Sequence, residues 1–184
     1  MKVLKNFLAI LIAIVSISLV SASAQTISGK KAVPVRSMEE QIFKKILALP
    51  NYGVFDNIKF AVNGDTVTLT GQVYSLGTAN EAASVVKRVP GVTNVVNNIT
   101  MLPPSPFDDS IRRQALRTFA VNGLGGYFWE SRPDVRIIVD HGNLTLEGYV
   151  MNQGDYNMLG VYARGLPNVF SVTNNLKIGK ELYR

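Results

Sequence analysis

Two stretches of this chain repeat one another at a constant spacing of 77 residues. The sequence VNGDTVTLTGQV begins at Val62, and the sequence VDHGNLTLEGYV begins at Val139. The same spacing carries the motif Asn97-Asn98-Ile99 onto Asn174-Asn175-Leu176. Several matches at one spacing indicate an internal duplication. Because two copies are too few for a solenoid, the repeat predicts two small domains in tandem.

Each copy has the pattern of a β-hairpin. In the first copy, the apolar residues Val67, Leu69 and Val73 alternate with polar ones, which predicts a strand with one buried face. Asn63-Gly64, just before this strand, is a signal for a type I′ turn. In the second copy the turn falls in Asp140-His141-Gly142-Asn143. The sequence therefore predicts the same hairpin twice.

A glycine lies inside the second strand of each hairpin, at Gly71 and Gly148. Glycine lowers the stability of a strand interior, so its presence indicates a β-bulge or the close approach of another backbone segment. A helix packed on the sheet is the expected neighbour.

Helix signals surround the first hairpin. The sequence Ser37-Met38-Glu39-Glu40 is a capping box, and Pro50 ends the helix that follows it. A second helix is predicted over 76–89, and a strand rich in Val and Ile follows over 92–102. The predicted order is helix, strand, strand, helix, strand. The fold class is therefore α+β, with two αββαβ modules, each a three-stranded sheet packed by two helices.

The second module departs from the first near its start. Its first helix is predicted over 106–121, with Phe107, Ile111, Ala115 and Phe119 facing the core. The hairpin then follows about eight residues later than the first module predicts, counted against the 77-residue spacing. The extra length lies near 123–133, in a stretch rich in glycine and aromatic residues.

The first 24 residues have the pattern of a secretory signal peptide. Two lysines precede an apolar run, and Ser21-Ala22-Ser23-Ala24 ends in the Ala-x-Ala form of a cleavage site. The run is short for a membrane span, which needs about 20 apolar residues. The sequence therefore predicts cleavage after Ala24 and export, with attachment to a membrane at most peripheral. An uncleaved anchor is the alternative.

These signals divide the chain into consecutive segments. A polar, basic leader of no periodicity follows the signal peptide, and a short proline-rich spacer separates the modules, which predicts a fixed rather than a loose connection. The predicted segments are the signal peptide 1–24, the leader 25–36, module one 37–102, the linker 103–106, module two 107–179 and the tail 180–184.

The charge and composition narrow the classes of function. The chain carries a formal net charge of +6 and has no cysteine and one histidine. Without cysteine, a lipoprotein attachment site and a disulfide framework are excluded. Removing the signal peptide removes two of the lysines, so the mature chain is only mildly basic. That charge suits an anionic surface but lacks the dense basic stripe of a nucleic-acid binder.

The repeated pattern resembles the BON domain (bacterial OsmY and nodulation). The resemblance is carried by the alternation that ends in Gly71-Gln72-Val73, by the following helix, and by VPGVTNVVNNI from Val89. Module two carries it more loosely, with Asn168 in place of the glycine. A signal peptide before two such domains is similar to small periplasmic BON proteins of Gram-negative bacteria. The resemblance implies an αββαβ sandwich, no catalytic site and association with the cell envelope, often through phospholipid.

The sequence lacks the residue combinations that an enzyme active site requires. His141 stands in a tight turn, where it reads as a solvated turn residue rather than a general base paired with Asp140. The glycine-rich stretch from Gly123 lacks the lysine and the preceding strand of a phosphate-binding loop. We therefore predict a protein that is not an enzyme, with no cofactor and no metal site.

One candidate surface remains, and it lies in module two. Arginine beside Trp and Tyr is the composition of a peripheral membrane site, because cations meet lipid phosphates and amphipathic rings lie at headgroup depth. The candidate lipid-binding residues are Arg112, Arg113, Arg117, Tyr127, Phe128, Trp129 and Arg132. In the alternative interpretation the arginines form a solvated helix face and the aromatic rings are buried, as large rings in small proteins usually are.

Two hypotheses about function follow. In the first, the protein binds anionic phospholipid at the periplasmic membrane surface, chiefly through module two. In the second, it is a protein–protein adaptor of the cell envelope, and its lipid contact is incidental. Nucleic acid is not an expected partner, other envelope proteins are, and the sequence leaves the oligomeric state open.

Overall fold

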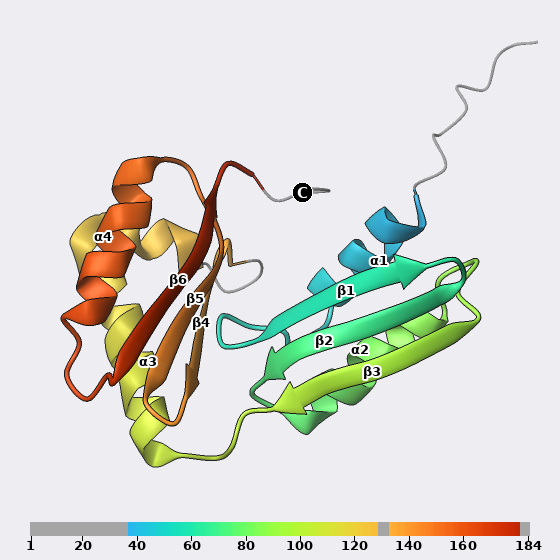
Figure 1. The fold of residues 1–184 in the computed structure, drawn as a ribbon, viewed down its shortest axis with the longest axis horizontal. Helices are drawn as coiled ribbons and strands as arrows, with labels where there is room; N and C mark the ends of the chain where they lie inside the picture. Colours follow the sequence, from blue (N-terminus) through green and yellow to red (C-terminus); the bar gives the residue numbers. More distant parts are fainter. Residues whose placement is uncertain (1–36, 129–132, 181–184) are drawn as a thin grey trace, which may run out of the picture. The chain divides into compact units, whose positions relative to one another are not determined.

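The structure is a computed structural model that describes residues 37–128 and 133–180. All of these residues belong to one compact unit of the chain, Val35–Arg184. The predicted signal peptide and leader, and the candidates Trp129 and Arg132, lie outside the described residues. The fold class is the predicted one: two α+β modules that follow one another along the chain (Figure 1).

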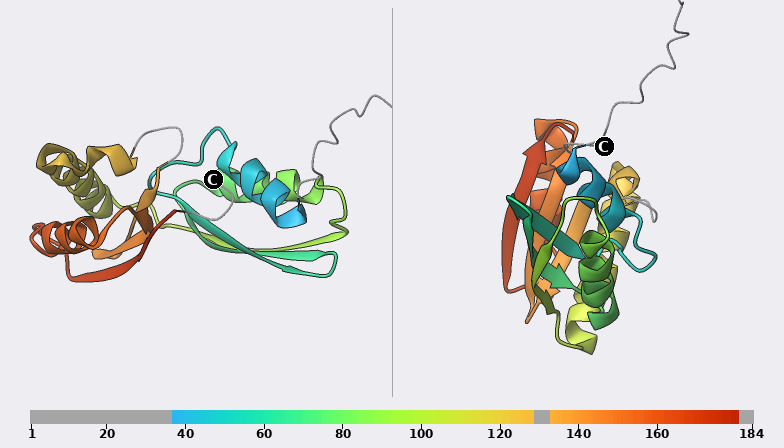
Figure 2. Two further views of the ribbon diagram at one scale, coloured as in Figure 1. Left: turned by 90° about the horizontal axis from the view of Figure 1, so that it is seen from above. Right: turned by 90° about the vertical axis from the view of Figure 1, so that its right-hand side faces the viewer.

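Module one has the predicted order of elements. Strands β1 and β2 are antiparallel, β2 and β3 are parallel, and the sheet order is β1-β2-β3. Figure 2 shows both helices on the same side of the three strands. The elements are α1 (Met38–Leu47), β1 (Asn57–Asn63), β2 (Thr66–Val73), α2 (Leu76–Lys87) and β3 (Asn94–Met101).

Module two repeats this topology, with the sheet order β4-β5-β6. Its first two strands are antiparallel and its last two are parallel, as in module one. Two short helical turns follow its first helix. The elements are α3 (Pro106–Phe119), η1 (Ala120–Leu124), η2 (Gly125–Phe128), β4 (Val135–Asp140), β5 (Asn143–Val150), α4 (Gln153–Arg164) and β6 (Ser171–Ile178).

The helices begin where the sequence predicts. The Ser37 side chain accepts a hydrogen bond from the backbone N–H of Glu40 at 3.1 Å, which caps α1. Ser105 does the same for the N–H of Asp108 at 3.1 Å, with Pro106 at the first helical position of α3. These caps satisfy N–H groups that a helix start leaves without partners.

The two hairpin turns differ, which corrects the predicted type I′ turn at Asn63-Gly64. In module one Asn63 pairs with Thr66, so the turn residues are Gly64 and Asp65. Only Gly64 has positive φ, as a type II′ turn requires. In module two both His141 (φ 49°) and Gly142 (φ 76°) are left-handed, which is the type I′ pattern.

The duplicated glycines allow a close approach of backbone, but of the neighbouring strand rather than of a helix. Gly71 has φ +118° and Gly148 has φ +117°. A Cβ on Gly71 would lie 2.0 Å from the carbonyl oxygen of Asn57, and one on Gly148 would lie 2.0 Å from that of Asp134. Only glycine fits both the backbone conformation and this space.

The duplicated asparagines fasten the third strand of each sheet to a helix. Asn97 donates a hydrogen bond to the carbonyl of Ala79 in α2 at 3.2 Å, and its Oδ1 accepts from the N–H of Ile99 at 3.2 Å. Asn174 makes the same pair of contacts, to the carbonyl of Tyr156 in α4 and from the N–H of Leu176. The repeated motif therefore has the same structural role in both modules.

Each module has its own hydrophobic core between helices and sheet. Module one buries Ile42 and Ile46 of α1 against the sheet, and module two buries Ile111, Ala115 and Phe119 of α3. Phe107 does not join this core, contrary to the prediction. It is 42% exposed, and its ring lies 5.8 Å from that of Phe170 at the surface.

The described part of the predicted insertion closes the core of module two. The chain leaves α3 through η1, where Gly123 has φ +81°, and continues into η2. Leu124 and Phe128 are buried, and the ring of Phe128 stacks on Phe119 with centroids 5.3 Å apart. The chain therefore kinks at Asn122 and Gly123 and then forms the 3-10 turn Gly125–Phe128, whose last residue is part of the core.

The loop between α1 and β1 of module one contacts module two. The N–H of Ile137 in β4 donates a hydrogen bond to the carbonyl of Val54 at 2.8 Å. Val54 and Phe55 also pack against the hydrophobic core of module two. The loop thus supplies a hydrogen-bond acceptor to the edge strand β4 of the second sheet. This contact agrees with the fixed connection that the short proline-rich linker predicts.

Candidate functional site

Arg112 does not lie on the solvated side of α3, where the sequence analysis placed it. The residue is 1% exposed. Nη1 lies 2.6 Å from Oδ1 of Asp109, Nη2 donates to the carbonyl of Val139, and the guanidinium lies 5.2 Å from the centre of the Tyr74 ring. Nε is buried and has no hydrogen-bond partner within the described residues. Arg112 therefore holds the fold together.

The helical period explains this placement. Asp108, Arg112, Ala115 and Phe119 recur at the spacing of one helix face, and all four are buried. Asp108 accepts hydrogen bonds from the backbone N–H groups of the β4–β5 turn, at 3.1 and 2.8 Å. Together the two charged residues bind the end of the hairpin to α3.

Arg113 and Arg117 are exposed, as predicted. They are four residues apart on α3, so they share one face of the helix. Val121, four residues further on, continues the same stripe and is 75% exposed. Two cations and an apolar side chain therefore project from one line along the surface of module two.

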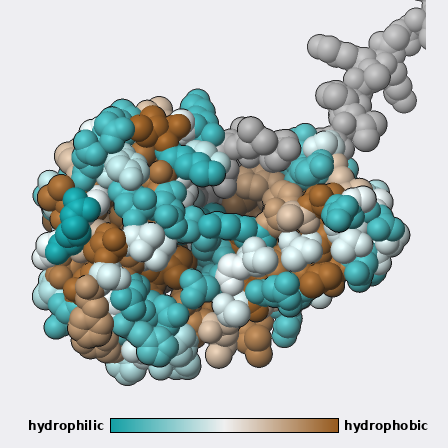
Figure 3. Space-filling model, in the orientation of Figure 1, coloured by the Kyte–Doolittle hydropathy of each residue, from teal (hydrophilic) through white to brown (hydrophobic). Residues whose placement is uncertain are grey.

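This stripe borders a shallow groove of about 350 Å³ between α3 and α4. Arg117 and Thr118 line it from α3, and Val161, Tyr162 and Leu166 line it from α4 and its end. Val161 is 58% exposed. Figure 3 shows hydrophobic surface among hydrophilic residues over the part of module two that contains α4. We call Arg113, Arg117, Val121 and Val161 the α3–α4 face.

The aromatic candidates are mainly structural. Phe128 is buried in the core of module two. The Tyr127 hydroxyl donates to Oδ2 of Asp155 and accepts from the N–H of Met151 at 3.0 Å, which fastens η2 to the start of α4. Burial raises the pKa of Tyr127, and its hydrogen bond to Asp155 raises it further. Phe128 is therefore a buried ring, as the alternative interpretation of the aromatic residues expects.

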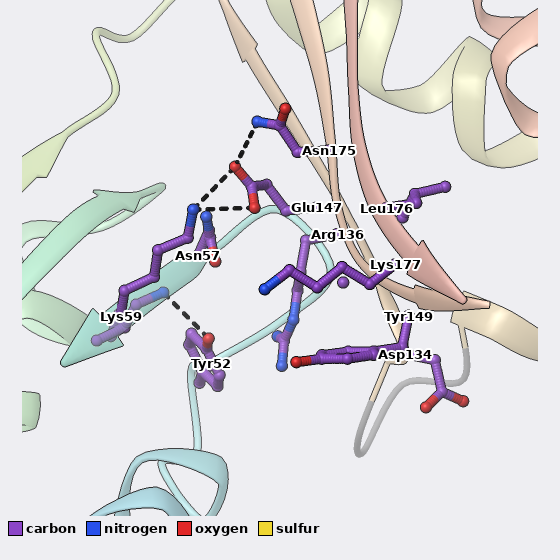
Figure 4. A pocket seen from close by; sticks show the side chains of 12 residues that line it. Tyr52, Asn57, Lys59, Asp134, Arg136, Glu147, Tyr149, Asn175, Leu176 and Lys177 are labelled. Carbon is purple, nitrogen blue, oxygen red and sulfur yellow. Dashed lines mark hydrogen bonds and ion pairs between the residues drawn. The ribbon is translucent and has the colours of Figure 1, made fainter. Parts of the chain in front are cut away.

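A second concave site lies between the modules, a cleft of about 600 Å³ (Figure 4). Module two contributes Arg136, whose side chain is 6% exposed. Its Nη1 donates to the carbonyl of Gly53 at 3.0 Å, and its guanidinium lies 4.2 Å from the centre of the Tyr52 ring. The Tyr52 hydroxyl in turn accepts from the N–H of Ile58 at 3.1 Å.

An ion pair crosses the same cleft. Nζ of Lys59 in module one lies 3.0 Å from the carboxylate of Glu147 in module two. Nδ2 of Asn175 also donates to this carboxylate, at 2.9 Å. Lys177 and Tyr149 complete the wall on the side of module two. The negative charge of Glu147 is therefore neutralised by Lys59 within the protein.

The sequence analysis did not identify the cleft, because its residues are distant along the chain and come together only in the folded unit. One signal was available. Arg136 interrupts the apolar run Val135–Val139, and a charged residue inside a buried strand is rare unless it has partners. The partners, however, are in module one.

The described residues contain no cluster of acidic or histidine side chains that could hold a metal ion. His141 is 78% exposed at its side chain, and its Nδ1 lies 2.6 Å from Oδ1 of Asp140. His141 also lines a surface cavity of about 430 Å³, together with Phe107 and Phe170. Within the described part of the chain, no helix has the length and apolar character of a membrane span.

Comparison with known families identifies the fold. The model of the BON domain matches the chain twice, over residues 36–103 and 108–180. The chain belongs to the BON domain family. BON domains are linked to association with membranes and the cell envelope, and their two matches correspond to the two modules described above.

Similar solved structures include CdsD, a structural protein of the type III secretion system of Chlamydia trachomatis. It is 12% identical, with a TM-score of 0.32, over 78% of this chain and 93% of that chain. The C-terminal domain of CdsD is 11% identical, with a TM-score of 0.31, over 79% of this chain and 100% of that chain. No curated protein sequence matches.

Proposed function

We propose that this protein is a non-enzymatic, exported protein of the periplasm that binds anionic phospholipid at the membrane surface through the α3–α4 face of module two. The observation that carries the proposal is the exposed line of Arg113, Arg117 and Val121 beside the groove that Val161 borders. Exposed cations next to exposed apolar side chains are what a peripheral membrane site requires.

The expected affinity is modest. Each basic residue near an anionic membrane contributes about 1 kcal/mol, so Arg113 and Arg117 together contribute about 2 kcal/mol. Burial of Val121 and Val161 in the headgroup region adds a hydrophobic contribution. Binding should therefore be reversible and should weaken as salt screens the charges. Trp129 and Arg132 remain candidates from the sequence.

The test is co-sedimentation of the mature protein, from Gln25 onward, with vesicles of phosphatidylcholine alone or mixed with phosphatidylglycerol. We expect pelleting with the anionic vesicles only, and less of it at high salt. The double variant Arg113→Glu, Arg117→Glu should lose most of this binding, since repulsion replaces attraction.

The matched control reverses two exposed charges in module one, Lys45→Glu and Arg88→Glu, with the same change in net charge. It should bind nearly as well as the unaltered protein. Equal binding by all three proteins would refute the α3–α4 face as the site, and equal loss in both variants would show that net charge alone governs binding.

A protein–protein adaptor is the second candidate function. The observation in its favour is the exposed ring pair of Phe107 and Phe170, next to Pro103 and Pro104 at a surface cavity of about 430 Å³. Aromatic residues are enriched at protein–protein interfaces. Absence of binding to both kinds of vesicle would favour the adaptor.

A further inference from the structure

The cleft between the modules is lined by two cationic side chains that make no direct ion pair within the described residues. Lys59 and Glu147 neutralise each other across it. Arg136 and Lys177 also line the cleft, and neither makes an ion pair in the part of the chain that the structure describes, although the charge of Arg136 acts on the buried carboxylate of Asp56. In Figure 4 the Asp134 carboxylate points away from Lys177. The lining of the cleft carries the cations Lys59, Arg136 and Lys177 against the carboxylates of Asp134 and Glu147, so cations outnumber carboxylates by one.

Arg136 is held in place before any ligand arrives. Arg136 is only 6% exposed, its guanidinium stacks on the Tyr52 ring, and one of its N–H groups donates a hydrogen bond to the carbonyl of Gly53. A guanidinium carries five N–H donors in a planar fork that matches the oxygens of carboxylate and phosphate. A fixed arginine loses little side-chain freedom when it binds an anion, so the site is preorganised.

The remaining walls of the cleft are suited to contact the uncharged part of an anionic ligand. Figure 4 shows the rings of Tyr52 and Tyr149 at the side of the cleft where Arg136 lies. A volume of about 600 Å³ is within the range of small-molecule sites. Tyrosine supplies both a flat apolar face and a hydroxyl.

We propose that this cleft binds a small molecule that carries a carboxylate or phosphate group, with Arg136 and Lys177 contacting the oxyanion and Tyr52 and Tyr149 contacting the adjoining body. The site is separate from the α3–α4 face, and it requires both modules, since Tyr52 and Arg136 come from different copies of the repeat. A lipid surface is not needed for its occupation.

The test is a titration followed by NMR, with the mature protein free of vesicles. The probes are phenyl phosphate, benzoate, inorganic phosphate and uncharged phenol. We expect phenyl phosphate or benzoate to shift the backbone amide signals of Arg136, Tyr149 and Lys177, and whichever binds more tightly identifies the preferred oxyanion. Phenol should cause no such shift, because it lacks the charge.

Two variants sharpen the result. Lys177→Gln should raise the dissociation constant about tenfold, since a charge-assisted hydrogen bond is lost. Lys180→Gln, which removes a charge nearby but outside the lining of the cleft, should leave it unchanged. Shifts absent with every anionic probe, or equal affinity in the protein and in Lys177→Gln, would overturn the proposal. Arg113→Glu with Arg117→Glu should bind the probes normally, so the lipid proposal can fail independently.

Discussion

Gly148 stands at a point where two strands come closer than a side chain permits. Its φ of +117° lies outside the range that other residues adopt, and the carbonyl oxygen of Asp134 occupies the space of a Cβ. The N–H of Tyr149, the next residue, donates to that same oxygen at 2.9 Å. The glycine thus permits a hydrogen bond that begins the pairing of β4 with β5.

Gly148→Ala should lower the free energy of unfolding by about 3 kcal/mol, because it adds backbone strain to overpacking. Gly126→Ala is the control, since a Cβ there meets no atom within 4 Å and the backbone has no positive φ. Urea unfolding of the two variants measures the difference. Similar midpoints for both would contradict the role given to Gly148.

The sequence indicated some of these residues and misassigned others, for identifiable reasons. A glycine inside an alternating strand is visible in the sequence, so its special role could be predicted, although not which neighbour approaches it. Arg112 was misassigned because arginine is ordinarily a surface residue. Its burial depends on Asp109 and on the Val139 carbonyl, and the second of these is 27 residues away along the chain.

At the scale of elements, each third strand depends on a single asparagine. Strands β3 and β6 lie at the edges of their sheets, where backbone N–H groups lack a neighbouring strand. The Oδ1 of Asn97 takes up the N–H of Ile99, while its amide group binds α2. One side chain therefore both covers part of the edge and joins the strand to the helix.

Asn97→Ala should lower the free energy of unfolding by about 2 kcal/mol, because it removes two hydrogen bonds of about 1 kcal/mol each. It should also speed hydrogen exchange at the Ile99 amide, which loses its acceptor. The neighbouring exposed residue gives the control Asn98→Ala, for which neither quantity should change. If exchange at Ile99 were unaltered in Asn97→Ala, the side chain would not be protecting that amide.

The order of helices and strands was predictable because each element carries its own periodicity, cap or turn signal. The duplication strengthened those signals by showing each of them twice. The course of the insertion was not predictable. Gly123 and its neighbours give no period, and the helical turns up to Phe128 exist because Leu124 and Phe128 fill the space beside Phe119.

At the scale of the whole molecule, Asp56 lies where the modules meet. It is 3% exposed and accepts hydrogen bonds from the N–H groups of Gly53 and Tyr74, both at 2.7 Å. Burial raises its pKa above the ordinary 3.8, while these bonds and the charge of Arg136 act in the opposite direction. Gly53 and Tyr74 both contact residues of module two, so Asp56 orders both contacts.

The raised pKa of Asp56 predicts a specific pH dependence. Since the folded protein binds this proton more tightly than the unfolded chain, the contribution of Asp56 to the free energy of unfolding is greatest below pH 3.8 and is lost as pH rises through the folded pKa. Asp65 has the opposite sign, because a hydrogen bond from Thr93 lowers its pKa. NMR titration of both carboxyl groups measures this, and an Asp56 pKa below that of Asp65 would refute it.

The cleft could not be predicted from either copy of the repeat alone. Lys59 in β1 and Arg136 in β4 stand at the same position of the 77-residue repeat, so a cation recurs at this point of both hairpins. Their partners lie in the other module, Glu147 for Lys59, and Tyr52 and Gly53 for Arg136. These partners come together only when the two copies are placed together.

The bond between Ile137 and Val54 has a consequence for how the two halves of this gene product can be rearranged. The loop that covers the second sheet precedes β1, and the corresponding stretch of module two has been lengthened and bent into helical turns instead. The copies are therefore no longer interchangeable. Reversing their order, or producing the second half alone, would leave β4 with a bare edge that invites pairing with another chain. The two modules therefore depend on each other, although they arose as copies of one repeat.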